Sequence, residues 1–178
     1  MKRPLRATLL ELARTDQQAR RSRKKSFTRV DRNNTIVLRK IVRSFGWPTI
    51  AMVGREAAMA AWLIAQHADH DPDFQAECLR MLRAAARRGQ ADRVYVPYLT
   101  DRVLVNQGKR QVYGTQFFVD RKGRFVPRPI KDKSSLSARR SKYKLGSFTA
   151  YYKRLAARQE QIASVDTRRK KPTKRDVS

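Results

Sequence analysis

The sequence is poor in residues that carry redox or metal chemistry: its 178 residues include one cysteine and two histidines. A single cysteine excludes an intrachain disulfide, and the simplest expectation is a reducing compartment. Cys78 lies on an apolar helical face near Phe74, Leu79 and Leu82, and such surroundings raise the pKa of a thiol. We therefore expect Cys78 to be a core residue and not a nucleophile.

Long hydrophobic runs and phosphate-binding loops are also missing. The longest uninterrupted apolar run, residues 57–65, spans nine positions, about half of the roughly 18 that indicate a membrane span. The sequence has no glycine-rich phosphate loop, no CxxC pair and no nucleophile elbow. Its arginine-rich beginning is interrupted by Glu11 and Asp16 and has no secretory apolar region, which argues against a targeting segment. We expect a cytoplasmic protein with no membrane span.

Acidic residues are scarce, with 15 of them against 42 lysines and arginines and a net charge of +27. The excess is uneven along the chain. Residues 1–45 hold 14 cations and 3 acids, residues 46–120 hold 9 and 8, and residues 121–178 hold 19 and 4. A nearly neutral centre between two basic flanks predicts a polyanionic partner such as a nucleic acid.

Helical periodicity dominates the first half of the chain. Apolar residues recur at helical spacing over residues 5–18, which predicts an amphipathic helix. Asn33 or Asn34 is expected to cap a second helix, which Gly46 ends. Trp47 belongs to a rigid Gly-Trp-Pro turn, and we expect its large ring to fill the core.

The stretch of residues 54–89 predicts two core helices that meet at a corner. The apolar pattern of the first helix stops in a polar cluster that contains both histidines, His67 and His70. Asp71 followed by Pro72 is typical of a helix start, because the carboxylate accepts from unpaired amides and proline suits the first helical position. Titratable side chains are therefore concentrated at this corner.

The remaining elements are a short helix, a hairpin and a basic helix. Pro97 and Gly108 are expected to open and close the short helix. Aromatic and β-branched residues around a turn predict a β-hairpin near residues 110–130. A helix is predicted over residues 147–161, and the segment beyond residue 164 has little to bury and should be disordered without a partner.

These elements predict a mainly α fold with a small β-hairpin (α+β), in which a compact helical domain is flanked by basic, partly disordered arms. We expect a basic N-terminal helix and arm over residues 1–26, a single domain over residues 27–161 and a disordered basic tail over residues 162–178. The chain is long enough for one such domain with a real core.

Several strings of the sequence are distinctive: GWPT at 46–49, AAWLIAQHADHDPDFQ at 60–75, YLTDRVLVNQGKRQVYGTQF at 98–117 and LGSFTAYY at 145–152. Over about residues 9–152 these strings resemble an uncharacterised bacterial family, domain-of-unknown-function family 6624. The resemblance implies a small helical domain with a hairpin, and it implies no activity, cofactor or catalytic residue. Because members of the family look less basic, the basic flanks suggest a domain recruited to a polyanion.

A metal site is one interpretation of the histidine corner. His67 and His70 are three residues apart, and the oxygen donors Asp69, Asp71 and Asp73 are near them in sequence. Such spacing is common, and zinc usually needs a third protein ligand from elsewhere. Helix capping and polar packing explain the same residues, so we predict neither a metal nor another cofactor.

A hydrolase or transferase site is the other interpretation. His67 would act as general base, Asp69 would orient it, and Gln116 would hold the substrate. Gly114 interrupts a predicted strand, which indicates that another group approaches its backbone closely. Buried hydrogen bonds between the helix pair and the hairpin explain these residues equally well, and we favour that structural interpretation.

The basic flanks favour a non-catalytic RNA-binding protein, associated with the ribosome or another ribonucleoprotein and its proteins. No signature of an RNA-recognition fold, zinc finger or basic zipper is present, so contact with the phosphate backbone is expected. Attachment to anionic lipid is disfavoured because the basic segments lack an apolar face. The candidate phosphate ligands are Arg20, Arg21, Arg23, Lys24, Lys25, Arg139, Arg140, Lys142, Lys144, Arg168, Arg169, Lys170, Lys171, Lys174 and Arg175. Aromatic residues among these cations would stack on bases if they are exposed: Phe27, Phe125, Tyr143, Phe148, Tyr151 and Tyr152.

Overall fold

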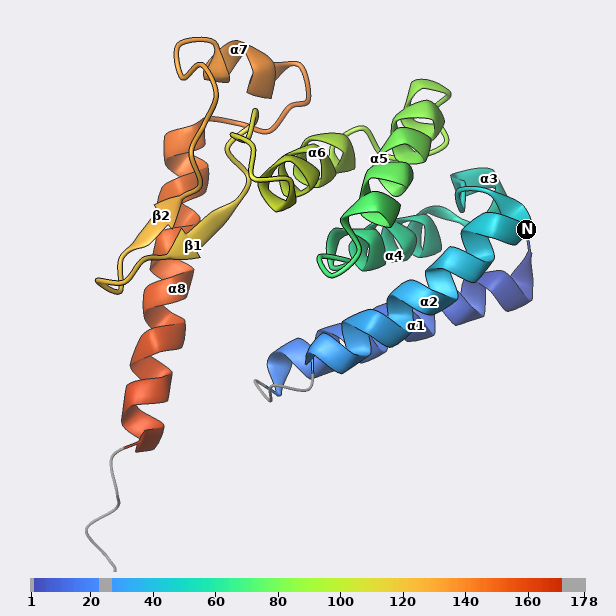
Figure 1. Ribbon diagram of the computed structural model, residues 1–178, viewed down its shortest axis with the longest axis horizontal. Coiled ribbons are helices and arrows are strands. Elements are labelled where there is room, and N and C mark those ends of the chain that lie inside the picture. Colours follow the sequence, from blue (N-terminus) through green and yellow to red (C-terminus); the bar gives the residue numbers. More distant parts are fainter. Residues whose placement is uncertain (1, 23–26, 171–178) are drawn as a thin grey trace, which may run out of the picture.

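The computed structural model describes residues 2–22 and 27–170. This part of the chain is mainly helical with one small antiparallel sheet, which confirms the predicted fold class (Figure 1). The elements are α1 (Arg3–Arg21), α2 (Phe27–Phe45), α3 (Ile50–Val53), α4 (Arg55–Gln66), α5 (Pro72–Arg87), α6 (Tyr95–Asn106), β1 (Phe117–Val119), β2 (Phe125–Pro127), α7 (Leu136–Ser141) and α8 (Phe148–Lys170).

The first helix is part of the core. Leu5 and Leu9 of α1 are buried, and α1 packs along α2 and α4. α4 contributes alanines such as Ala57 and Ala61, both fully buried, and small side chains let packed helices approach closely. Residues 3–21 therefore belong to the compact fold and are not part of a separate arm, while residues 23–26 lie outside the described residues.

The second helix begins earlier than its sequence indicates. α2 starts at Phe27, so neither Asn33 nor Asn34 caps it. The Asn34 side chain is instead buried, and its amide donates to the carbonyl of Leu12 in α1 at 3.1 Å. A tertiary hydrogen bond has thus replaced the local capping bond that asparagine makes at helix starts.

The predicted helix pair and its corner are confirmed. α4 ends at Gln66, and α5 begins at Pro72 with the Asp71 carboxylate accepting from the amide of Phe74 at 3.2 Å. Trp47 is 6% exposed and belongs to the core, as expected from its turn. We call the helices α1–α6 the N-terminal lobe.

The hairpin pairs β1 with β2, and Phe118 lies opposite Val126. Its strands are shorter than predicted, because the chain before Phe117 forms a loop instead of extending the sheet. α8 packs along the hairpin through aromatic side chains, and α7 lies beside the start of α8 (Figure 1). We call residues 111–170 the C-terminal lobe. In Figure 1, α6 lies between this lobe and the helices α4 and α5.

The last helix continues past the predicted end at Gln161. α8 runs to Lys170, nine residues beyond that prediction. These residues contain no glycine or proline, and the first proline of the segment is Pro172. Residues 171–178 lie outside the described residues. No helix among the described residues is long and apolar enough to cross a membrane.

Candidate functional site

His67 ends α4 and contacts a buried carboxylate of α1. Its Nδ1 lies 2.7 Å from Oδ1 of Asp16, a residue that is 1% exposed. The carboxylate accepts this hydrogen bond in the tautomer that carries the proton on Nδ1. Burial raises the pKa of Asp16, but the hydrogen bond and charge of His67 and the charge of Arg20 outweigh burial and lower it. Asp16, and not Asp69, therefore orients His67.

Arg20 supplies positive charge to this cluster. Its Nη2 donates to Asp31 at 2.7 Å and to Asp16 at 3.3 Å, and its Nε lies 3.2 Å from Nδ1 of His67. Burial raises the pKa of Asp31 even though Arg20 lowers it. Asp16, Asp31 and His67 offer ligand atoms within 4.8 Å of one another, which is the arrangement a metal ion would need. The guanidinium of Arg20 already pairs with both carboxylates, and the exposed His70 is not a member of the group.

Asp69 and Gln116 are brought together by an arginine. Arg102 donates two hydrogen bonds to Asp69, at 2.8 and 2.5 Å, and a third to Oε1 of Gln116 at 3.0 Å. Burial raises the pKa of Asp69, but the hydrogen bonds from Arg102 and Asn106 outweigh burial and lower it. Among the described residues Asp69 makes no hydrogen bond with His67, so the structure joins two of the three predicted catalytic residues and places the third elsewhere.

A buried aspartate explains the unusual sequence before the hairpin. Asp101 of α6 is 0% exposed and accepts from the amides of Val112, Tyr113 and Thr115, and also from the Thr115 hydroxyl. Burial raises the pKa of Asp101, and these hydrogen bonds act in the opposite direction. The loop is thereby wrapped around one carboxylate, which gives it a structural role.

Gly114 has the close neighbour that the sequence indicated. Its φ is +69°, and a Cβ at this position would lie 2.8 Å from the Phe148 ring. Both the backbone conformation and the contact therefore require glycine.

Cys78 is fully buried, and burial raises the pKa of its thiol. The prediction of a core cysteine is confirmed.

Three of the candidate phosphate ligands have structural roles instead. Arg140 is 2% exposed and donates to the carbonyls of Tyr113, Leu145 and Gly146. Arg139 donates to backbone carbonyls that include Val112, at 2.9 Å. These guanidinium groups already use several of their donors on the protein, and Arg20 likewise donates through Nη2 to Asp16 and Asp31.

The other candidates fall into two groups. Arg21, Lys142 and Lys144 are exposed. Arg168, Arg169 and Lys170 belong to the end of α8, and their side chains lie outside the description. The candidates that lie outside the described residues altogether are Arg23, Lys24, Lys25, Lys171, Lys174 and Arg175.

Most of the aromatic residues stack on one another. The ring of Phe117 lies 5.1 Å from that of Phe125 and 6.2 Å from that of Phe148, and Tyr152 stacks on the same group. These rings form the interior of the C-terminal lobe. Among the predicted stacking residues, Phe27 is 41% exposed, which leaves it accessible to a base.

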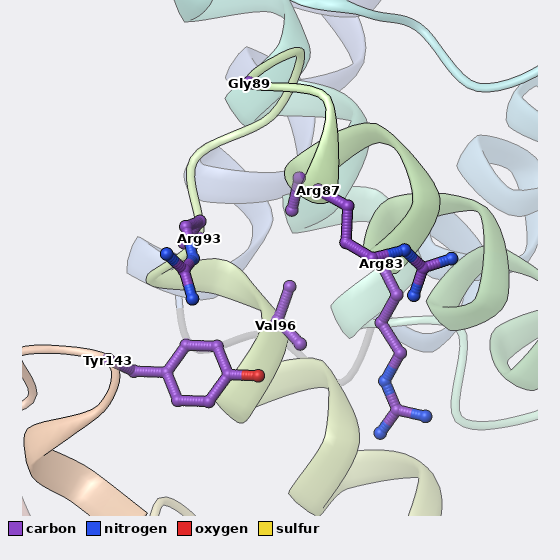
Figure 2. Close-up of a pocket in the computed structure, with 7 residues that line it drawn as sticks. Arg83, Arg87, Gly89, Arg93, Val96 and Tyr143 are labelled. Carbon is purple, nitrogen blue, oxygen red and sulfur yellow. The ribbon is translucent and has the colours of Figure 1, made fainter.

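Sequence reasoning missed a basic recess. Arg83 and Arg87 of α5 and Arg93 of the α5–α6 loop line a recess of about 550 Å³ together with Val96 and Tyr143 (Figure 2). The count of charges by segment concealed it, because residues 46–120 are nearly neutral overall. The spacing of Arg83 and Arg87, one helical turn apart, was the available signal.

No curated protein and no solved structure matches the chain. The model of one protein family does match, and its match extends from residue 8 to residue 170, which includes all of α8. The resemblance predicted from the sequence strings is confirmed. The chain thus belongs to the family of unknown function DUF6624.

Proposed function

We propose that this protein binds RNA without catalysing a reaction, as a component or associate of a ribonucleoprotein. In this proposal the C-terminal lobe contacts the phosphate backbone, and the N-terminal lobe holds that lobe in place. Contact with backbone phosphates needs exposed cations on a stable support and does not need base-reading side chains.

One observation carries the proposal. Between residues 121 and 158 the structure exposes eleven lysines and arginines, and Arg124 alone among them is ion-paired with a described residue. They are Arg121, Lys122, Arg124, Arg128, Lys131, Lys133, Lys142, Lys144, Lys153, Arg154 and Arg158. Exposed cations without carboxylate partners repel one another, and a polyanion relieves that repulsion.

The test is a salt titration of RNA affinity with a matched pair of double variants. Lys153→Glu/Arg158→Glu reverses two exposed charges of α8, and Lys40→Glu/Arg43→Glu reverses two exposed charges of α2. Both change the net charge equally. At about 150 mM salt we expect the α8 variant to bind a structured RNA about tenfold or more weakly, with a salt slope that is smaller by about two. The α2 variant should stay within about threefold of the wild type.

Two outcomes would contradict the proposal. Equal losses in both variants would mean that affinity follows net charge and not the surface of the C-terminal lobe. Affinity that does not fall as salt rises would exclude phosphate contacts, since these release counterions. Duplex DNA is the comparison ligand, and tighter binding to it than to RNA would also contradict the proposal.

A small hydrolase or transferase acting on RNA or a nucleotide is the second candidate. The contact between Asp16 and His67 favours it, because a carboxylate on Nδ1 leaves Nε2 of a neutral ring to accept a proton. Neither His67 nor Gln116 lines any of five recesses formed by the described residues. We therefore rank it below RNA binding.

The second candidate has its own test. His67→Ala and Asp16→Asn should each abolish turnover of RNA and leave RNA affinity unchanged if the pair is catalytic. Turnover at the wild-type rate in His67→Ala would exclude this site. Loss of folding in that variant would assign His67 a structural role.

A further inference from the structure

We infer that the recess lined by Arg83, Arg87 and Arg93 binds a phosphorylated nucleoside, either as a free nucleotide or as the phosphorylated end of an RNA. The inference deepens the proposed function by naming the group that one site would hold. It rests on the proposed RNA binding only where it names an RNA end as the source of the phosphorylated nucleoside.

The arginines of this recess are available to an anion. None of the three is ion-paired with a carboxylate among the residues that the structure describes. Arg83 donates one hydrogen bond to the hydroxyl of Thr100 at 3.0 Å, which leaves other N–H groups of its guanidinium without a described acceptor. Like charges one helical turn apart destabilise a helix, and a bound anion between them would remove that cost.

A phosphate fits the donors better than a carboxylate does. The three arginines come from two elements and line two sides of the recess, with Arg93 above the Tyr143 ring and Arg83 and Arg87 on the other side of Val96 (Figure 2). A terminal phosphate presents three acceptor oxygens, and arginine binds such oxygens through two parallel N–H groups. The bond to Thr100 holds Arg83 near this position before a ligand arrives.

The remaining lining suits a nucleoside. Val96 and Ala86 are buried apolar side chains of the wall, and the Tyr143 ring projects toward Val96 with Arg93 above it (Figure 2). The edge-on contact between Tyr143 and Tyr113, with ring centres 5.4 Å apart, fixes this ring. An aromatic face and an arginine are the groups on which bases stack. A volume of about 550 Å³ exceeds what an inorganic phosphate needs and lies in the range of small-molecule sites.

A second recess extends the basic surface. It has a volume of about 450 Å³ and shares Gly89, Arg93 and Tyr143 with the first. Lys142 and Lys144 also line it, and its carboxylate, Asp92, lies 3.9 Å from the guanidinium of Arg55. An RNA whose end occupies the first recess would meet further cations in the second.

Calorimetry with the full chain at about 150 mM salt tests the inference, with adenosine monophosphate, adenosine and inorganic phosphate as probes. We expect the monophosphate to bind, and to bind at least about tenfold more tightly than either of the others. Adenosine binding equally well would exclude a phosphate site. Inorganic phosphate binding equally well would exclude the nucleoside part.

A matched pair of variants locates the binding. Arg87→Ala/Arg93→Ala removes two arginines of the recess, and Arg80→Ala/Arg88→Ala removes two exposed arginines on or beside α5 that do not line it. We expect the first to weaken binding of the monophosphate about tenfold or more and the second to change it less than about threefold. Equal losses would overturn the inference. Tyr143→Leu should weaken the monophosphate and leave inorganic phosphate unchanged, and the opposite result would also overturn it.

Two RNAs of one sequence separate the sources. If the 5′-phosphorylated RNA binds more tightly than the 5′-hydroxyl form, and only with Arg87 and Arg93 intact, the ligand is an RNA end. Equal affinity of the two RNAs, with monophosphate binding retained, assigns the site to a free nucleotide. RNA binding that depends on α8 without any monophosphate binding would overturn this inference alone. Monophosphate binding without RNA binding that depends on α8 would overturn the proposed function alone.

Discussion

The two lobes are stabilised by different means. The N-terminal lobe buries mainly aliphatic side chains, and Leu9, Leu38 and Ala61 are each 0% exposed. Among the described residues of the C-terminal lobe, Ile130 and Leu136, each 7% exposed, are the buried apolar side chains, and the interior aromatic rings are half-buried and stacked. Apolar burial is the larger source of stability, so the C-terminal lobe depends on polar contacts with α6.

The exposed cations gather in the lobe that has fewer buried apolar side chains. The eleven exposed cations belong to the C-terminal lobe, which is joined to α6 through Asp101 and Arg102. A cationic lobe attached by a buried carboxylate keeps its outer surface available for a partner. In the proposed function, the N-terminal lobe is the support for this surface.

The largest expected effect is on the N-terminal core. Phe74 is 1% exposed and packs under the Arg39 guanidinium, 4.3 Å from its ring centre. Phe74→Ala should lower the free energy of unfolding by about 3–5 kcal/mol, because it leaves a cavity in a close-packed interior. Phe117→Ala, in the half-buried ring stack, should cost less than half as much. Denaturant unfolding measures both, and equal losses would show that the lobes do not differ in this way.

Asp101→Ala should act on the joint between the lobes. The substitution leaves the amides of Val112, Tyr113 and Thr115 buried without an acceptor, at a cost of about 2–4 kcal/mol. Hydrogen exchange should accelerate in residues 112–116 and in the hairpin while α1 and α4 stay protected.

Thr115→Val provides the matched control at the same site. It removes the hydroxyl's hydrogen bond to Asp101 and the one that it accepts from Gln116 Nε2, and it keeps the amides satisfied, so we expect a loss of about 1–2 kcal/mol. If Asp101→Ala accelerated exchange equally in both lobes, they would unfold as one unit, and the comparison between them would fail.

The local rules that sequence provides predicted most of the fold. Helical spacing indicated the helices, and the Asp71 carboxylate caps α5 as its position before Pro72 indicates. Gly46 and Gly108 follow α2 and α6 with positive φ, as helix-ending glycines do. Each of these features depends on a few neighbouring residues, which is why the sequence was sufficient.

The parts that could not be predicted depend on pairs far apart in the chain. Asp16 and His67 are 51 residues apart, and only the packing of α1 against α4 brings them together. Arg140 resembles a solvated cation in its basic run, yet three carbonyls surround its guanidinium. The recess of Arg83 and Arg93 likewise needs the α7–α8 loop to complete it. Sequence spacing contains no information on such contacts.

The smallest expected effect concerns the pH dependence of stability, because folding lowers the pKa of Asp16 and raises the pKa of Asp101. The pKa of Asp16 is lowered in the folded state, since the hydrogen bond from His67 outweighs burial. Its stabilising contribution is present above the unfolded pKa of about 4 and is lost as pH falls through the folded pKa. Burial raises the pKa of Asp101, so its contribution increases as pH falls toward about 4.

Asp16→Asn should therefore lower stability by about 1–2 kcal/mol at neutral pH and by progressively less as the pH falls below about 4. Urea unfolding measured in steps from neutral pH to about pH 3 would show the two curves converging. Glu77→Gln, which changes an exposed carboxylate of α5, is the control and should follow the wild type throughout. A constant difference between Asp16→Asn and the wild type at every pH would mean that Asp16 acts through packing and not through its charge, because removal of a carboxylate with a lowered pKa cannot leave the acid limb unchanged.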